Sequence, residues 1–191
     1  LDELAVYSVA SSFAGAALVF QAIFSVVWAP TVYKWSAQGA NMQVVDKIAK
    51  QVLAAICLIV ALCATFAWVL DYLLPPHYAG VKSILLCMLM QPLLYTLSEV
   101  TGVGIGIQRR TMLSVWVTLA ALACNVALSA YLVPSMGAKG AAIANALAFT
   151  VFFIARTEAS ARVWRNFKRG YLYLTVALIA SFCILIAVDI I

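Results

Sequence analysis

The sequence predicts an all-α polytopic membrane protein with about six transmembrane helices. Of its 191 residues, 66% are hydrophobic and 10% are charged, and the mean hydropathy is +1.05. Soluble domains are about half apolar and about a quarter charged, so the composition excludes an ordinary water-soluble domain. The apolar stretches also lack the alternating pattern of a membrane β-barrel, which leaves helices as the structure that can pair every backbone group in hydrocarbon.

Six apolar stretches, most of them long enough to span a bilayer, give the expected helices in order. They fall at residues 4–33, 51–70, 83–108, 111–133, 140–155 and 171–188. The first is longer than a span requires, so we expect it to tilt or to turn near Trp28, Ala29 and Pro30. The fifth is short, and we expect Lys139 and Arg156 to snorkel to the two membrane interfaces. Residues 133–137 contain Pro134 and Gly137 and predict a tight reversal.

The basic residues alternate between the predicted loops. The loops after the first, third and fifth stretches carry ten, which are Lys34, Lys47, Lys50, Arg109, Arg110, Arg156, Arg162, Arg165, Lys168 and Arg169. The loops after the second and fourth carry Lys82 and Lys139. The positive-inside rule places the richer set in the cytoplasm and both ends of the chain outside. The net charge of +5 is therefore interpreted as topology, and no nucleic-acid partner is expected.

The two inner segments 36–50 and 156–169 look amphipathic. In the second, the apolar residues Val163, Trp164 and Phe167 alternate with arginine and lysine. Such a pattern suits a segment lying on an anionic membrane leaflet. The simpler interpretation is that these charges only set the orientation of the chain.

One acidic residue, Glu99, lies well inside a predicted span, where a carboxylate normally faces a bundle interior or a water-filled cavity. Helical spacing places it on a stripe of polar and small residues that resembles a cavity wall. The stripe contains Gln91, Tyr95, Ser98, Glu99, Gly102 and Gly106. Glu99 is a candidate for coupling to a proton or sodium ion, or for accepting a hydrogen bond from a hydroxylated substrate. The alternative is a neutral glutamic acid satisfied by a neighbouring helix.

The other polar groups in the spans have similarly divided interpretations. Gln21, Asn125 and Asn145 are mid-span amides that either join helices or contact a substrate in a central lumen. Arg109 and Arg110 either bind a lipid headgroup or pyrophosphate or only set topology. The glycine run at 102–106 is not a phosphate-binding loop, because it follows no strand, and we assign it to close helix packing.

Enzymatic and metal chemistry find little support in the sequence. The five cysteines are scattered through apolar runs without a C-x-x-C pair, and His77 is the only histidine. We therefore expect no catalytic residues, no metal site and no organic cofactor. The chain begins Leu1-Asp2-Glu3, which is neither an initiator methionine nor a basic signal peptide, and this predicts a sequence that starts partway through a larger protein.

Three segments carry a resemblance to a known family. They are residues 6–10 opening a long helix that reaches Pro30, residues 74–78 with the sequence LPPHY, and residues 131–145 with the sequence YLVPSMGAKGAAIAN. Together they resemble the C-terminal part of a Wzx-type polysaccharide flippase, which exports O-antigen or exopolysaccharide units. The wider superfamily also contains multidrug exporters and the peptidoglycan-precursor flippase. The most specific signal is the P-x-x-G-x-x-G-A-A-I-A element, and the resemblance covers residues 1–160.

The resemblance implies that the chain forms most of one lobe of a two-lobed exporter. Residues 1–160 would be the C-terminal transmembrane lobe, 161–170 a basic cytoplasmic segment and 171–191 an additional terminal helix. The implied activity is to flip an undecaprenyl-pyrophosphate-linked oligosaccharide across the bacterial inner membrane. Its partners would be that lipid-linked oligosaccharide, membrane lipids and an N-terminal lobe preceding Leu1. In several family members, basic side chains line the lumen, whereas the predicted spans here carry no basic residue deep in the membrane.

Two other functions remain open from the sequence. One is a multidrug or peptidoglycan-precursor exporter of the same superfamily. The other is a membrane-embedded glycan polymerase or acyltransferase, which the short outer loops disfavour because they hold few residues able to do catalysis. A half-protein with only a scaffolding role is a third interpretation.

Overall fold

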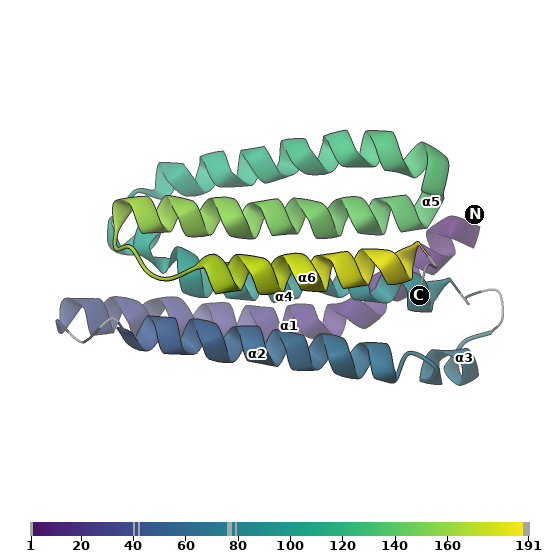
Figure 1. The fold of residues 1–191 in the computed structure, drawn as a ribbon, viewed down its shortest axis with the longest axis horizontal. Coiled ribbons are helices and arrows are strands. Elements are labelled where there is room, and N and C mark those ends of the chain that lie inside the picture. The colour runs from purple at the N-terminus through teal and green to yellow at the C-terminus, as the bar shows by residue number, and fades with distance from the viewer. Residues whose placement is uncertain (1, 40, 42, 76–77, 79, 189–191) are drawn as a thin grey trace.

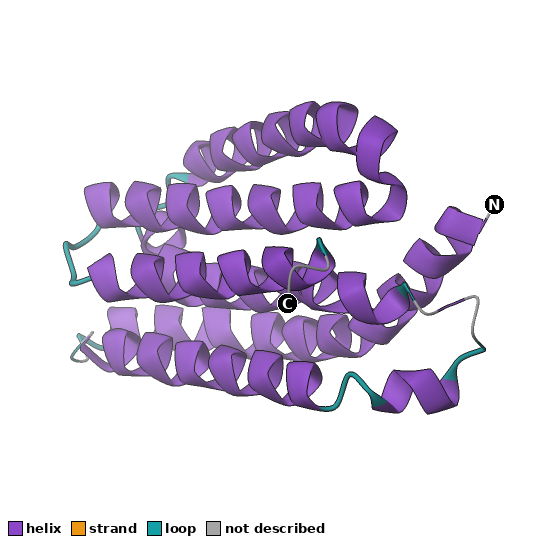
Figure 2. Ribbon diagram, turned by 45° about the vertical axis from the view of Figure 1, so that its right-hand side comes forward, coloured by secondary structure: helices purple, strands orange, loops and turns teal. Residues whose placement is uncertain are grey.

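The computed structural model describes residues 2–39, 41, 43–75, 78 and 80–188, and within these residues every regular element is helical (Figure 2). Five helices are long and apolar enough to cross a membrane, and α3 (Val69–Leu73) is a single short helix between two of them. The five are α1 (Asp2–Ala37), α2 (Gln43–Thr65), α4 (Val81–Ile107), α5 (Thr111–Val163) and α6 (Gly170–Ala187). The prediction of an all-α polytopic membrane protein is confirmed.

Helix α5 contains two of the predicted spans. A straight helix of 53 residues would be about 80 Å long, but α5 turns sharply at Gly137, which has φ 55° and ψ −130°. Its first limb (111–136) and second limb (138–163) run antiparallel beside each other (Figure 1). Gly137 permits this turn because, without a Cβ, it adopts positive φ readily. The reversal predicted at residues 133–137 is thus confirmed, and α5 accounts for two of the six predicted spans.

Helix boundaries differ from the apolar stretches where packing extends a helix beyond its apolar run. Helix α1 continues through Pro30, so the turn considered at that point is wrong. Trp28 and Val32 on either side are buried, and this packing outweighs the one backbone hydrogen bond that proline removes. The second limb of α5 likewise extends past Arg156 to Val163, because Thr157 and Ser160 are buried against α4.

Helix α4 is the centre of the bundle. In its most apolar window, 78% of the residues are buried inside the protein, against 28% or less for the other spanning helices. Helices α1, α2, α5 and α6 all pack on it. The terminal helix α6 shares the same hydrophobic core and buries Leu172, Val176 and Ala180, which recur every four residues along one face. One core therefore joins the last predicted span to the rest.

The glycine run of α4 allows its neighbours to approach closely, as predicted. A Cβ on Gly104 would lie 2.6 Å from both Ser160 Oγ and Trp164 Cβ, and a Cβ on Gly106 would overlap the Tyr33 hydroxyl. Between membrane helices such close packing replaces the hydrophobic effect, since lipid tails are as apolar as the side chains. The run therefore joins α4 to α1 on one side and to the second limb of α5 on the other.

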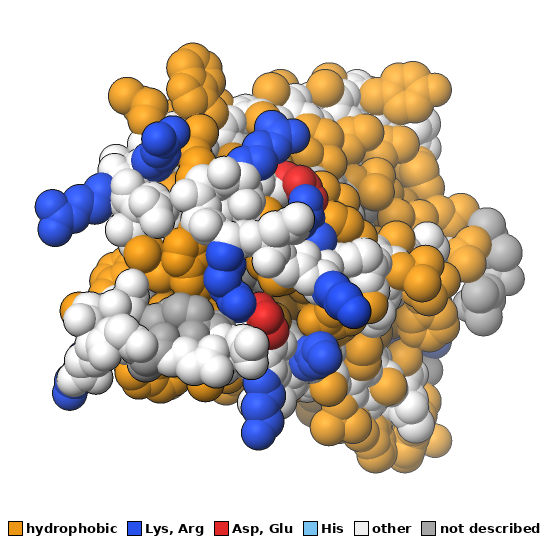
Figure 3. Space-filling model, turned by 60° about the vertical axis from the view of Figure 1, so that its left-hand side comes forward, with side chains coloured by type: hydrophobic (Ala, Val, Ile, Leu, Met, Phe, Trp, Pro, Cys, Tyr) orange, Lys and Arg blue, Asp and Glu red, His pale blue; other side chains and the backbone are white. Residues whose placement is uncertain are grey.

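The charges are distributed unequally between the two ends of the bundle. Helices α1 and α4 and the second limb of α5 all finish at the same end, and α2, α6 and the first limb begin there (Figure 1). The ten basic residues of the richer loops are located toward this end, which we call the basic end. Figure 3 shows lysine and arginine side chains gathered on it beside extensive apolar surface. The alternation counted in the sequence thus corresponds to one face of the molecule.

Candidate functional site

A cavity of about 660 Å³ lies between α1, α4 and the two limbs of α5. Five of the six residues predicted to face a substrate line it, and these are Gln21, Gln91, Tyr95, Asn125 and Asn145. Hydroxyl groups from the first limb of α5 and aromatic rings from its second limb complete much of the wall. The cavity therefore presents several polar side chains within a mostly apolar lining.

The four amides come from four different helical segments, and three of them lie at similar depth. Counting from the basic end, Gln91 is 16 residues from the end of α4, Asn125 is 14 from the start of α5 and Asn145 is 18 from its end, or about 21 to 27 Å along the helices. Gln21 lies closer to the basic end, because Ser25, one turn further along α1, already contacts Glu99. We call these four residues the amide layer.

Two of the four amide-layer side chains form a hydrogen bond with each other. Asn145 Nδ2 donates a hydrogen bond of 3.1 Å to Gln91 Oε1, which joins α5 to α4. The side chains of Gln21 and Asn125 make no hydrogen bond to another described residue. A polar group left without a partner at this depth in a membrane is costly. Their exposure in the cavity therefore favours a space filled by water or by a polar ligand.

The middle of the cavity is aromatic. The rings of Tyr95 and Phe152 stack with centroids 5.7 Å apart and planes 8° from parallel, and Phe149 meets Phe152 edge-on. Tyr95 and Phe152 lie 12 and 11 residues from the basic end of their helices, or about 17 Å. This aromatic pair therefore lies between the three deeper amides and the basic end.

Arg156 lines the cavity beyond the aromatic pair, closer to the basic end. Its guanidinium carbon is 5.6 Å from the centroids of both the Tyr95 and Phe152 rings. Its Nη1 donates a hydrogen bond of 3.3 Å to Ser98 Oγ, and its Nε is buried without a hydrogen-bond partner. A Cβ on Gly102 would lie 2.8 Å from Arg156 Cγ, so that glycine makes room for the side chain.

Arg156 is the lining residue that the sequence interpretation missed. The expectation that the spans offer no cation to the cavity is wrong at this position. The sequence predicts a position at a membrane interface, because the arginine follows an apolar run, but the helix continues two turns past it. Its spacing was the available signal, because Asn145, Phe149, Phe152 and Arg156 are separated by three or four residues and share one helix face.

Glu99 belongs to a second, smaller space of about 170 Å³. The Ser25 hydroxyl on α1 donates a hydrogen bond of 2.6 Å to Glu99 Oε2, and the Trp28 indole donates one of 3.1 Å to the Glu99 backbone carbonyl. A neighbouring helix therefore supplies a partner to Glu99. Arg156 lines this space as well as the larger one.

The stripe predicted on α4 is consequently divided between two spaces. Gln91 and Tyr95 line the larger cavity, whereas Glu99, Gly102 and Gly106 line the smaller one. Ser98 lines neither, and its hydroxyl accepts the hydrogen bond from Arg156. The stripe winds around α4, because a spacing of four residues exceeds one helical turn and the face drifts along the helix.

Arg109 and Arg110 lie at the turn between α4 and α5, where both are exposed. Arg109 has a positive φ of 54°, which is uncommon outside glycine. Neither residue lines the two cavities. Their predicted contact with a headgroup or pyrophosphate stays a prediction about the basic end.

The basic segment 161–170 turns its aromatic residues inward, which differs from the amphipathic arrangement considered above. Trp164 packs with the cluster that contains Trp28 and Val103, and Phe167 packs against the main core. Arg165 forms an ion pair with Asp46 at the start of α2. The segment is therefore held against the helices through its apolar side chains and through Arg165.

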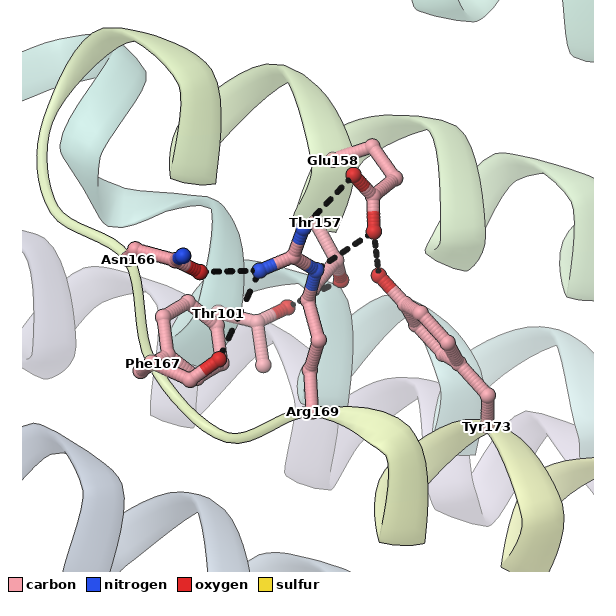
Figure 4. A network of polar contacts seen from close by, with 7 residues as sticks. All are labelled: Thr101, Thr157, Glu158, Asn166, Phe167, Arg169 and Tyr173. Atoms are coloured by element: carbon pink, nitrogen blue, oxygen red, sulfur yellow. Dashed lines mark hydrogen bonds and ion pairs between the residues drawn. The ribbon is translucent and has the colours of Figure 1, made fainter.

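A second ion pair fixes the turn between α5 and α6 (Figure 4). Two nitrogens of Arg169 bind the carboxylate of Glu158, and the Tyr173 hydroxyl donates to the same carboxylate at 2.7 Å. The hydrogen bond to Glu158 raises the pKa of the Arg169 guanidinium above its ordinary value. A bidentate pair of this kind is geometrically specific, so it sets how α6 begins.

Nothing in the described part of the chain resembles a metal centre, because it contains no group of three or more His, Cys, Asp or Glu side chains able to hold an ion. His77 lies outside the described residues. All five cysteines are free thiols.

The cavity and its residues are the features from which a function can be argued. The chain matches no protein-family model, no curated protein and no solved structure.

Proposed function

We propose that the chain is part of a membrane transporter that flips an undecaprenyl-pyrophosphate-linked oligosaccharide across the bacterial inner membrane. The observation that carries this proposal is the cavity between α1, α4 and α5, with its amide layer, its aromatic pair and Arg156. The sequence resemblance to Wzx-type flippases supports it. The spanning helices provide the membrane setting.

The lining residues match the chemistry of such a substrate. Amide side chains both donate and accept hydrogen bonds, as sugar hydroxyls do. Aromatic faces offer flat apolar surface, and the guanidinium of Arg156 suits a phosphate oxygen because it presents several donors in a fixed plane. The partly buried position of Arg156 strengthens this attraction, since screening by water is weaker there.

The proposal also includes a second lobe and an orientation. We expect the basic end to face the cytoplasm, and we expect an N-terminal lobe to complete the lumen opposite the amide layer. Tagging the C-terminus at the chromosomal locus tests the second expectation. A band of about twice the 20.6 kDa mass would support a two-lobed protein. A band at 20.6 kDa itself would contradict the proposal that both lobes lie on one chain.

Glu99 is proposed as the coupling group, with a proton or a sodium ion as the coupled species. It is a carboxylate inside the bundle, in a small space that it shares with Arg156. Replacing Glu99 with glutamine keeps the hydrogen-bonding shape and removes the charge. Transport by Glu99→Gln with unaltered rate and unaltered ion dependence would contradict this role.

The flipping activity is tested by deleting the gene and following lipid-linked repeat units. We expect these units to accumulate in the inner leaflet, and we expect the wild-type gene to restore export. The Arg156→Gln variant should restore it poorly, while Arg162→Gln, an exposed arginine on the same limb, should restore it fully. A change in glycan length without accumulation would favour a polymerase instead.

A multidrug exporter is distinguished by the charge of its substrates. Many such substrates are cations, and Arg156 is the charged side chain among the described residues that line the larger cavity. A cationic drug would therefore be repelled where a phosphate is attracted. Resistance to cationic drugs that depends on this gene, together with normal lipid-linked sugar export in its absence, would overturn the flippase proposal.

A further inference from the structure

We infer that the lipid-linked oligosaccharide lies along the cavity in one direction, with its phosphates at Arg156 and its sugars extending past the aromatic pair to the amide layer. This inference rests on the proposed function. It goes further by assigning separate subsites to the two chemical halves of the substrate and by fixing which half lies deeper.

The inference depends on the order of the lining groups along the cavity. Arg156 is seven residues from the basic end of its helix, or about 10 Å, whereas the aromatic pair is at about 17 Å and Gln91, Asn125 and Asn145 are at about 24 Å. The cation therefore lies nearest the basic end and these three amides lie deepest, with the aromatic pair and Gln21 between them. A substrate that is anionic at one end and hydroxylated at the other has the same order.

The reverse direction is disfavoured by the charge of the two ends. Among the described lining residues, the amide layer holds no cation that could compensate a phosphate. An uncompensated anion at that depth in a membrane carries a large desolvation cost. Sugar hydroxyls at the level of Arg156 would meanwhile leave the one cation of the described cavity lining without a phosphate to bind.

The amide layer is prepared for a ligand with many hydroxyl groups. Gln91 and Asn145 hold each other in place through their hydrogen bond, while the side chains of Gln21 and Asn125 face the same cavity from the opposite segments. Fixed and free amides thus surround one space. A sugar placed there would offer hydroxyls to both pairs.

The aromatic pair lies between the phosphate subsite at Arg156 and the sugar subsite at the deeper amides. Tyr95 and Phe152 stack on each other, and the guanidinium of Arg156 is near both rings. This contact holds the arginine beside the rings through cation–π attraction. A sugar attached directly to the phosphate would therefore meet the rings first, and the outer sugars would meet the amides.

The direction is tested by photo-crosslinking in vesicles that contain the full protein. The probe is an undecaprenyl-pyrophosphate-linked disaccharide with a diazirine on its terminal sugar, and adducts are located by peptide mass spectrometry. We expect adducts near Gln21 and Asn125 and few near Ser114, which lines the cavity at the first turn of α5. Adducts concentrated near Ser114 and Arg156 would overturn the inferred direction.

Binding of substrate fragments by purified variants provides the second measurement. Asn125→Ala should weaken binding of a short alkyl glycoside about three- to ten-fold, as expected for one lost hydrogen bond, and leave binding of farnesyl pyrophosphate unchanged. Arg156→Gln should do the reverse. Gln51→Ala, an exposed amide on α2, and Arg162→Gln are the matched controls. Equal losses for both fragments in each variant would contradict separate subsites.

The outcomes separate this inference from the proposed function. Flipping that depends on Arg156, combined with reversed adducts, would leave the function standing and reject the direction. Adducts and fragment binding in the inferred order, without any flipping by the native protein, would reject the transport function and leave a binding site with this polarity.

Discussion

The two limbs of α5 have similar lengths and similar apolar composition, but they are held very differently. The second limb buries many residues, including Ala142, Ala144 and Phe153, whereas Val117 is the buried residue of the first limb. Side chains of the second limb also form hydrogen bonds with α4, while the hydroxyls of the first limb bond within the limb itself. Apolar character alone therefore does not distinguish a fixed wall from a loosely held one.

The difference arises from small residues and hydroxyl groups at one helix contact. Gly102 and Gly104 let the second limb lie close to α4, and Thr101 and Thr157 join across the seam with a 2.7 Å contact (Figure 4). The first limb instead exposes large side chains such as Trp116 and Leu122. One wall of the cavity is consequently rigid, and the opposite wall depends mainly on the turn at Gly137.

The largest expected effect comes from filling the seam of the rigid wall. In Gly104→Ala the new Cβ would lie 2.6 Å from Ser160 Oγ and Trp164 Cβ, so the helices must separate. Overpacking of this kind costs up to about 3 kcal/mol of unfolding free energy. Thermal unfolding of the purified protein in detergent should show a clear fall in Tm.

Gly15→Ala is the matched control for that substitution. Nothing lies within 4 Å of a Cβ built on Gly15, and alanine has the better helix propensity. Its Tm should be unchanged or slightly higher. A Tm for Gly104→Ala as high as that of Gly15→Ala would mean that the seam is not close-packed.

The turn between the limbs should be the next most sensitive position. Gly137→Ala places a side chain at φ 55° and puts its Cβ 2.5 Å from Glu3 Oε2. The backbone strain costs about 1 to 2 kcal/mol, and the first limb should lose its fixed angle to the second. Hydrogen exchange should accelerate in the first limb more than in the second.

Gly170→Ala separates a general loss of stability from an effect on the turn. A Cβ at Gly170 has nothing within 4 Å, and the residue begins α6. Exchange in the two limbs should stay as in the wild type. Uniform acceleration across both limbs in Gly137→Ala would contradict the view that this turn positions one limb.

A smaller effect is expected from the hydroxyl contact across the seam. Thr157→Val removes the hydrogen bond to Thr101, whose own hydroxyl also bonds to the Leu97 carbonyl. The loss should therefore be about 1 kcal/mol, measured as a lower Tm. Thr118→Val, at an exposed position of the first limb, should leave Tm unchanged, and an equal fall in both variants would remove the contrast between the limbs.

The arrangement of the helices could be predicted because it depends on hydrophobic length and on one turn. The apolar stretches 83–108 and 171–188 lie within a residue or two of α4 and α6, and the reversal at 133–137 is present. Helix ends that are stabilised by packing could not be predicted in this way. The second limb extends past residue 155 because Thr157 and Ser160 bury polar side chains against α4.

The cavity could be predicted in part for a related reason. Mid-span amides are few, so Gln21, Gln91, Asn125 and Asn145 were evident as candidates, and all four line it. The depth of each amide depends on where its helical segment begins and ends and on how that segment is offset from its neighbours. The contribution of Arg156 depends on a helix extending beyond its apolar run, which hydrophobic length does not reveal.

The smallest expected effect is at the N-terminal end of the second limb, which lies away from the basic end. Glu3 Oε2 accepts a hydrogen bond of 2.7 Å from the Ala138 backbone N–H, which places a carboxylate at the N-terminal end of that limb, where the helix dipole favours it. Glu3→Gln retains an acceptor but loses the charge, so about 0.5 kcal/mol of stability should be lost. Glu3→Ala loses both and should have a lower Tm still. The difference between wild type and Glu3→Gln should shrink in 1 M salt, because screening weakens the charge contribution. A difference that persists unchanged in salt would show that Glu3 holds this limb through hydrogen bonding alone.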